Sequence, residues 1–370
     1  MSLRFFIAAL ICVACCRTAG AGTSLPDQVA RLRACADSLH SAGRTDSAVI
    51  VGEKAVALAL KSGDPTLIVG SHASQGVFLR STGDVDGALR QYEEALSIVT
   101  SDEFRRNPGQ EAVEEAASLY INLAVLNLDT DNKEAAAADA ALAADWVSKS
   151  NDRELRATVF GVAGSVMTGC GDLRKAMRYQ DLAYRDAEAS GDRESAFRAA
   201  AYAMLIASRL GNTADEGAWR GRCAALLPEM KSVMAKLVYY QAECSISLSA
   251  GRRREAIDWF QKILSVDGID NLPFVKFDCY NNMHAVYAQL GDYGMAYATV
   301  LKSNQLRDSL WESEKAQSLR DLSVKYETKE KELALARSEA VSLHHHGSAL
   351  LPYVGERLVL RGEHPVRSRR

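Results

Sequence analysis

The chain has 370 residues, of which 48% are hydrophobic, 25% are charged and only 7% are aromatic, and its formal net charge is −3. This length can form a large core or several domains. The charge excludes a general nucleic-acid binder, which normally carries a strong basic excess. Only 7 prolines occur in the whole chain, which leaves room for long helices.

The N-terminus predicts a secretory signal peptide over residues 1–21. Residues 5–16 form an apolar run after a positive start, and the small-residue segment 19–21 is typical of a cleavage site. The run is too short for a stable transmembrane helix. We therefore expect a mature chain from Gly22 in the periplasm or another extracytoplasmic space. The alternative is a lipoprotein signal with Cys15 as the anchored residue, although the position where such signals usually have Leu holds another Cys.

The rest of the chain repeats itself. Each copy can be placed on one anchor residue, which is Gly in six copies and Asp in one, and the anchors stand 40 residues apart except for one step of 48. The longer step contains Pro108-Gly109, which predicts an extended loop. The anchors are Gly43, Gly83, Asp131, Gly171, Gly211, Gly251 and Gly291.

Small residues recur at fixed positions relative to each anchor, and we call the set of residues at one such position a column. One column holds Ala in six copies of seven. Five residues after the anchors stand Ala48, Ala88, Ala136, Ala176, Glu216, Ala256 and Ala296. Twelve after them stand Ala55, Ala95, Ala143, Ala183, Cys223, Ile263 and Ser303. Seven before them stand Ala36, Gly76, Ala124, Gly164, Met204, Cys244 and His284.

These columns predict pairs of closely packed helices. Gly accepts the left-handed conformation that ends a first helix, and the polar residue after it suits the start of the second. Small residues on both sides of the turn let the two helices cross closely. A single pair has too little core and must stack on its neighbours. We therefore predict an all-α, α-α superhelical solenoid of about seven helix pairs over residues 22–304.

The segments "YINLAVLNLDTDNKEA" and "YNNMHAVYAQLGDYGMA" resemble tetratricopeptide (TPR) repeats. The resemblance covers roughly residues 26–310, with a unit longer than the standard one of about 34 residues. The fifth copy departs from the pattern because Glu216 occupies the Ala column, and the sixth lacks the Asp after its anchor.

The TPR resemblance implies a peptide or protein partner in the concave groove lined by the first helices. By analogy, residues two to six, nine, ten and thirteen before each anchor face that groove. Asn and Arg suit peptide backbones and carboxylates through hydrogen bonds. The paired Lys/Asn pattern of carboxylate-clamp TPRs is absent, so acidic C-terminal tails are not predicted as ligands. The candidate groove residues are Arg80, Ser81, Asn122, Arg198, Tyr202, Arg209, Asn282 and Gln289.

After the repeats, residues 305–342 predict a long charged helix, because the segment lacks Gly and Pro. Apolar residues near heptad spacing leave two alternatives open: a short dimeric coiled coil, which would make the protein a homodimer, or a solvated helix packed partly on the solenoid. Residues 343–370 change composition abruptly, which favours a disordered tail or a truncated or frame-shifted end.

Residues 307–332 resemble the juxtamembrane helix of bacterial extracytoplasmic TPR sensors. That resemblance implies a second hypothesis, the sensor portion of a signal-transduction receptor, but no run of 18 apolar residues follows Ala340. The first hypothesis is an exported, non-enzymatic TPR scaffold for a peptide or protein partner.

No catalytic constellation, cofactor motif or metal site is predicted. Asp129-Thr130-Asp131 lacks the later ligands of a calcium loop, and His344-His345-His346 lacks flanking ligands. The five cysteines after residue 21 are odd in number and scattered, which favours small core residues over a metal site and leaves one unassigned disulfide as an alternative.

Overall fold

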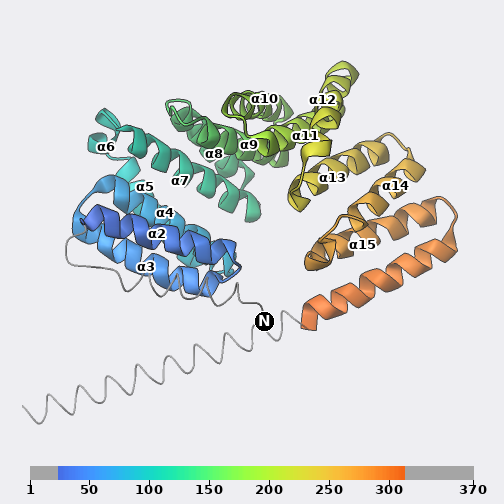
Figure 1. Cartoon of the computed structure of the whole chain (residues 1–370), viewed down its shortest axis with the longest axis horizontal. Helices are drawn as coiled ribbons and strands as arrows, with labels where there is room; N and C mark the ends of the chain where they lie inside the picture. The colour runs from blue at the N-terminus through green and yellow to red at the C-terminus, as the bar shows by residue number, and fades with distance from the viewer. Residues whose placement is uncertain (1–23, 313–370) are drawn as a thin grey trace, which may run out of the picture. The chain divides into compact units, whose positions relative to one another are not determined.

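The computed structural model describes residues 24–312, which contain helices and turns and no β-strand (Figure 1). The predicted signal peptide, the tail and most of the predicted long helix lie outside the described residues. Two compact units can be distinguished. The first holds residues 24–271 with 289–291, and the second holds residues 272–288 with 292–312.

In the first unit, helices follow one another in pairs, and we call the two members of each pair the first and second helix. The first helices are α2 (Leu25–Ser41), α4 (Pro65–Ser81), α7 (Gln110–Asp129), α9 (Arg153–Cys170), α11 (Arg193–Arg209) and α13 (Val233–Ser249). The second helices are α3 (Thr45–Ser62), α5 (Val85–Val99), α8 (Lys133–Val147), α10 (Leu173–Ser190), α12 (Thr213–Leu226) and α14 (Arg253–Leu264).

Short helices lie between some pairs: α6 (Asp102–Arg106), η1 (Leu227–Glu229) and η2 (Ile269–Asn271). The second unit contains α15 (Pro273–Gln289) except for its last residue, and a helix that begins at residue 293 and continues to the last described residue, 312. It therefore contains one further helix pair.

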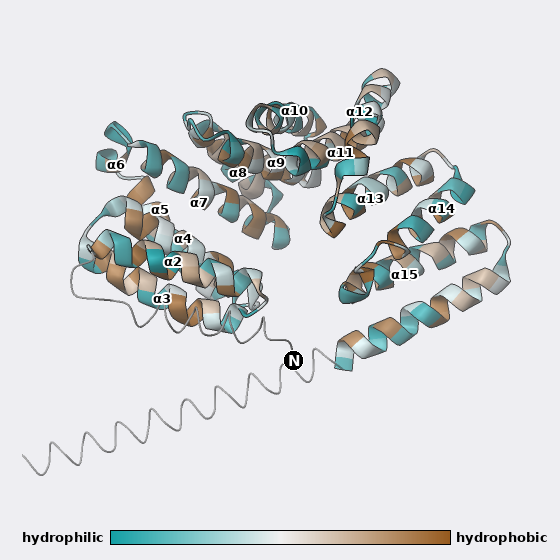
Figure 2. Cartoon of the chain, in the orientation of Figure 1, coloured by the Kyte–Doolittle hydropathy of each residue, from teal (hydrophilic) through white to brown (hydrophobic). Residues whose placement is uncertain are grey.

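Each first helix packs on the second helix of its own pair, and the first helices also contact one another in the order α2, α4, α7, α9, α11, α13. This produces a continuous row of first helices, whose surface away from the second helices we call the first-helix face. Figure 2 shows apolar and polar residues mixed along every helix, as expected where one side of each helix packs against neighbours. The predicted all-α solenoid of stacked pairs is confirmed.

All seven anchors adopt the left-handed conformation, with φ between 59° at Asp131 and 87° at Gly171. Asp131 is the one non-glycine residue with positive φ among residues 24–312. Where the residue after the anchor is Asp or Asn, its side chain caps the second helix as predicted: Asp84 Oδ1 accepts from the Gly87 amide at 2.8 Å, and Asp172 Oδ1 accepts from the Lys175 amide at 3.0 Å. Arg44 and Arg252, which follow the anchors of the first and sixth copies, make no such side-chain cap. The predicted turn chemistry is confirmed.

The small-residue columns form the contact between paired helices. In the first unit, the five Ala residues of the column five after the anchor are completely inaccessible to solvent. In the column seven before, Gly76 faces Tyr92, and a Cβ on Gly76 would lie within 3.0 Å of the Tyr92 ring. Gly164 faces Gln180 in the same way. Where a large side chain enters from the second helix, the first helix thus provides glycine.

The exceptional Glu216 belongs to a polar network. Arg220 donates to both carboxylate oxygens of Glu243 at 2.8 and 2.9 Å, and also to Glu216 at 2.8 Å. The Tyr239 hydroxyl donates to Glu243 at 3.0 Å. The Glu243 side chain is only 3% exposed. Glu216 thus takes part in a charged network that joins α12 to α13.

The long step between the second and third copies contains α6 within the predicted loop. Ser101 caps this helix by accepting from the Phe104 amide at 3.3 Å, and Phe104 is buried edge-on against Trp146, with ring centroids 6.3 Å apart. Part of the loop is thus held by the core, which the composition of the segment did not predict.

No disulfide joins any of the five cysteines among residues 24–312. Cys223, Cys244 and Cys279 are buried, as expected for small core residues. Burial raises the pKa of Cys223 to about 12, which leaves it unreactive. Among residues 24–312, no helix has the length and apolar character needed to cross a membrane.

Candidate binding pocket on the first helices

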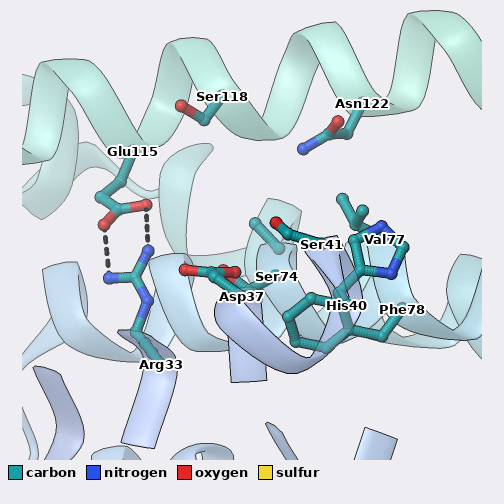
Figure 3. Close-up of a pocket in the computed structure, with 11 residues that line it drawn as sticks. Arg33, Asp37, His40, Ser41, Ser74, Val77, Phe78, Glu115, Ser118 and Asn122 are labelled. Carbon is teal, nitrogen blue, oxygen red and sulfur yellow. Dashed lines mark hydrogen bonds and ion pairs between the residues drawn. The ribbon is translucent and has the colours of Figure 1, made fainter. Parts of the chain in front are cut away.

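A pocket of about 220 Å³ lies on the first-helix face at the N-terminal end of the row (Figure 3). Three successive first helices contribute to it, and no second helix does. The lining comprises Arg33, Asp37, His40 and Ser41 from α2, Ala73, Ser74, Val77 and Phe78 from α4, and Glu115, Ser118 and Asn122 from α7.

An ion pair closes one end of the pocket. Arg33 donates from Nη1 to Glu115 Oε1 at 2.6 Å and from Nη2 to Oε2 at 3.1 Å, so the pair is bidentate. The two side chains are 23% and 20% exposed. Gly70 of α4 lies beneath them, and a Cβ there would lie within 3.0 Å of both partners. The missing side chain at position 70 lets the ion pair pass over α4 and join α2 to α7.

The middle of the pocket is polar and has free hydrogen-bonding capacity. Ser118 and Asn122 extend from α7 toward the side chains of α2 and α4, and the dashed bonds in Figure 3 join only Arg33 and Glu115. Asp37, at the mouth of the pocket, is exposed. Desolvation by the surrounding helices raises the pKa of the Asp37 carboxyl, against the opposing effects of Arg33 and His40. These groups can bind a ligand without first breaking a hydrogen bond within the described chain.

The other end is aromatic and apolar. The rings of His40 and Phe78 lie 5.4 Å apart and are tilted by 52°. His40 Nδ1 lies 3.4 Å from the Thr45 hydroxyl, a contact that orients the imidazole. Val77 completes this end of the lining. The pocket thus offers charge at one end, polar groups in the middle and apolar surface at the other end.

Of the candidate residues, Asn122 lines this pocket. Arg80 and Ser81 lie in the last turn of α4, outside it. Arg80 donates to Asp129 at 2.8 Å, and Ser81 donates to the carbonyl of Val77 at 2.9 Å. Arg80 is therefore engaged in a contact between repeats.

The remaining candidates lie further along the chain. Arg198, Tyr202 and Arg209 are on α11, where Arg198 is exposed and donates to Ser195 at 3.1 Å. Asn282 and Gln289 are exposed residues of α15, of which Asn282 belongs to the second unit and Gln289 to the first. The eight candidates are thus spread over four first helices, and the structure gathers no two of them in the pocket.

Of the eight candidate groove residues chosen from the sequence, only Asn122 lines the pocket. The positions expected to face the groove nevertheless include most of the lining. Every lining residue except Glu115 stands at one of the offsets expected to face the groove. Asp37 stands six before its anchor and Ser118 thirteen before. Glu115 stands sixteen before Asp131, one helical turn beyond the offsets considered. Only the stacking of α2 on α4 and α7 shows that the first three copies supply the pocket.

The described chain thus has an all-α, TPR-like fold, and solved structures share it. RapI in its apo form matches with a TM-score of 0.56 at 12% identity, over 77% of this chain and 99% of RapI. A STAND signal-transduction ATPase with a tetratricopeptide repeat sensor, from Pyrococcus horikoshii, matches with a TM-score of 0.54 at 14% identity, over 78% of this chain and 44% of that protein.

A Rap protein complexed with competence and sporulation factor matches with a TM-score of 0.51 at 15% identity, over 75% of this chain and 74% of that protein. No family model matches the chain, and no curated protein matches it. At these identities the likeness establishes the fold alone.

Proposed function

We propose that this protein is a non-enzymatic interaction scaffold that binds a peptide or protein partner on its first-helix face. The observation that supports this most directly is the pocket between α2, α4 and α7, whose polar middle has unused hydrogen-bonding groups. The Rap protein of similar fold was solved in complex with competence and sporulation factor, so a fold of this kind can hold such a partner.

The chemistry of the pocket suits an extended polypeptide. The Asn122 amide offers both a donor and an acceptor, which match the carbonyl and N–H of one peptide unit. The volume of about 220 Å³ is below the roughly 300–1,000 Å³ of typical small-molecule sites. It therefore suits a side chain of a longer ligand that continues along the row of first helices.

Site-specific photo-crosslinking tests this function. A photoreactive benzoylphenylalanine placed at Ser118 lies in the pocket, whereas the same group at Ser97 lies on the exposed side of the second helix α5. We expect a crosslinked partner from the cell envelope at position 118 and none at 97. The purified partner should then bind the Asn122→Ala variant about tenfold more weakly, as expected for one lost hydrogen-bonding group. Equal crosslinking at both positions would refute the proposal.

We also propose that the protein acts outside the cytoplasm, because residues 1–21 have the features of a signal peptide. The N-terminal sequence of the protein isolated from the periplasmic fraction should begin at Gly22. Recovery of the intact N-terminus in the cytoplasmic fraction would contradict export, and a lipid-modified Cys15 would favour the lipoprotein alternative.

A sensor portion of a signal-transduction receptor is the second candidate. It is favoured by the resemblance of residues 307–332 to the helix that follows TPR sensors, and the STAND protein of similar fold carries a TPR sensor. The nucleotide sequence after codon 340 distinguishes the two. A transmembrane segment encoded there in another frame would support the sensor, whereas a stop codon without one would favour the scaffold.

A further inference from the structure

We propose that the pocket between α2, α4 and α7 accepts a basic side chain, lysine or arginine, of the peptide segment bound on the first-helix face. This inference rests on the proposed function, and it adds which chemistry the pocket selects. The proposal follows from the charges in the lining, from the arrangement of polar and apolar groups around the Asp37 carboxylate, and from the pairing of Arg33, the arginine that lines the pocket, with Glu115.

Charged residues enter the lining from α2 and α7. Both oxygens of Glu115 are taken by the two terminal nitrogens of Arg33, so this ion pair contributes no net charge. The lining from α4 contains no charged residue, and α7 contributes no ionisable group besides Glu115. The carboxylate of Asp37 is therefore the one acidic group of the lining that has no ion-pair partner among residues 24–312. It is available to pair with a cationic group of a ligand.

The Asp37 carboxylate lies between the charged end and the apolar end of the pocket (Figure 3). Asp37 lies on α2 between Arg33, one turn before it, and His40, nearly one turn after it. A cationic group paired with Asp37 would have its methylene groups beside Val77 and the tilted His40 and Phe78 rings. Long basic side chains bind in this manner, with an apolar stem on apolar surface and a charged end on a carboxylate.

The pocket is unsuited to an acidic side chain. The guanidinium of Arg33 is the cationic group that an acidic ligand would need, but it is already bound bidentately and partly buried. An acidic side chain would have to displace Glu115 and would also meet the Asp37 carboxylate. Neutral side chains would leave the charge of Asp37 partly desolvated and unpaired. A basic side chain alone improves the electrostatics of the pocket.

The backbone of the ligand can bind to α7. Ser118 and Asn122 extend from α7 over the same pocket, opposite Asp37. They can bind the main chain on one side while the side chain reaches Asp37 on the other. This division assigns affinity for any peptide to α7 and selectivity for basic residues to α2, and separate variants can therefore test each role.

The test uses fluorescent hexapeptides that differ only at one central position, which holds Arg, Lys, Gln or Glu in an otherwise Gly/Ala sequence. Binding to the full chain is measured by fluorescence anisotropy at low ionic strength. We expect the Arg and Lys peptides to bind at least about fivefold more tightly than the Gln peptide, as for one partly exposed charge pair, and the Glu peptide to bind most weakly. Agmatine added as a free guanidinium compound should compete only weakly, because it lacks the backbone contacts.

Asp37→Asn should abolish the preference, so that the Arg, Lys and Gln peptides bind within about twofold of one another. The matched control is Asp46→Asn, which removes the same charge from the exposed first turn of α3 in the same helix pair. This control should keep the preference. Circular dichroism shows whether both variants are folded.

Three outcomes would overturn the inference: no preference for basic residues in the wild-type chain, a preference that survives Asp37→Asn, or no binding of any of the four peptides. Photo-crosslinking at Ser118 separates these from failure of the proposed function. A partner captured at position 118, together with equal binding of all four peptides, would leave the scaffold standing and remove only the basic selectivity.

Discussion

Removal of Arg220 should leave the buried carboxylate of Glu243 without its ion-pair partner. Glu243 is only 3% exposed, and its two oxygens accept from Arg220 at 2.8 and 2.9 Å, whereas the Tyr239 hydroxyl provides just one further bond. In Arg220→Ala, the Glu243 charge would remain in the core with only the Tyr239 bond. Breaking a buried ion pair in this way costs about 3–5 kcal/mol.

The expected magnitude is somewhat smaller, because the Arg220 side chain is 35% exposed and water can partly replace it. We expect the free energy of unfolding to fall by about 2–3 kcal/mol. Urea unfolding followed by far-ultraviolet circular dichroism measures the loss. Hydrogen exchange should accelerate in α11, α12 and α13 while the amides of α2 and α4 keep their protection, because each repeat contacts only its neighbours.

The matched control is Arg252→Ala. Arg252 pairs with Glu255 at 2.7 Å, but the two side chains are 45% and 43% exposed, so the loss should stay below about 1 kcal/mol. Adding Glu243→Gln to Arg220→Ala should restore part of the stability, because it removes the buried negative charge that has lost its partner. A loss in Arg220→Ala no greater than in the control, or a further loss on adding Glu243→Gln, would refute this account.

Three further outcomes are expected. Gly76→Ala should lower the free energy of unfolding by about 1–3 kcal/mol despite the better helix propensity of Ala, because the new Cβ overlaps the rigid, buried Tyr92 ring; an increase in stability would contradict this packing. Asp37→Asn should stabilise the protein more at neutral pH than in acid. Desolvation by the surrounding helices raises the pKa of this carboxyl, so the stability that its protonated form contributes is present below its ordinary value of 3.8 and is lost as pH rises through the raised pKa. Urea unfolding at both pH values should show that the free energy of unfolding of the variant minus that of the wild type increases with pH, and a decrease would contradict this. Tyr202→Ala combined with Arg209→Ala should weaken binding of the partner without loss of helicity if the α11 part of the face takes part in binding; unchanged binding would remove α11 from the binding surface.

Much of the fold could be predicted from the sequence because its determinants are local. The left-handed residue at each anchor, the capping side chain after it and the small residues that flank it all lie within about twenty residues of one another. They act through backbone sterics and close contact between two adjacent helices. The repeat of this local pattern is sufficient to define helix pairs, and Ala176 or Ala256 is buried for the same reason as Ala48.

For the pocket, the sequence could predict only the positions, relative to each anchor, that face the groove. The residues that line the pocket together are far apart in the sequence. Arg33 and Glu115 are 82 positions apart, and they meet only because α2 and α7 both pack on α4 and Gly70 leaves space between them. The exception at Glu216 likewise becomes intelligible only beside Arg220 and Glu243. The sequence by itself determined the helix pair and its turn, since these depend on steric contacts between residues that are close in the sequence. The stacking of the helix pairs on one another decided which charged side chains are paired and that the Asp37 carboxylate has no ion-pair partner. This pairing depends on distances between helices that are far apart in the sequence, and no local sequence pattern specifies those distances.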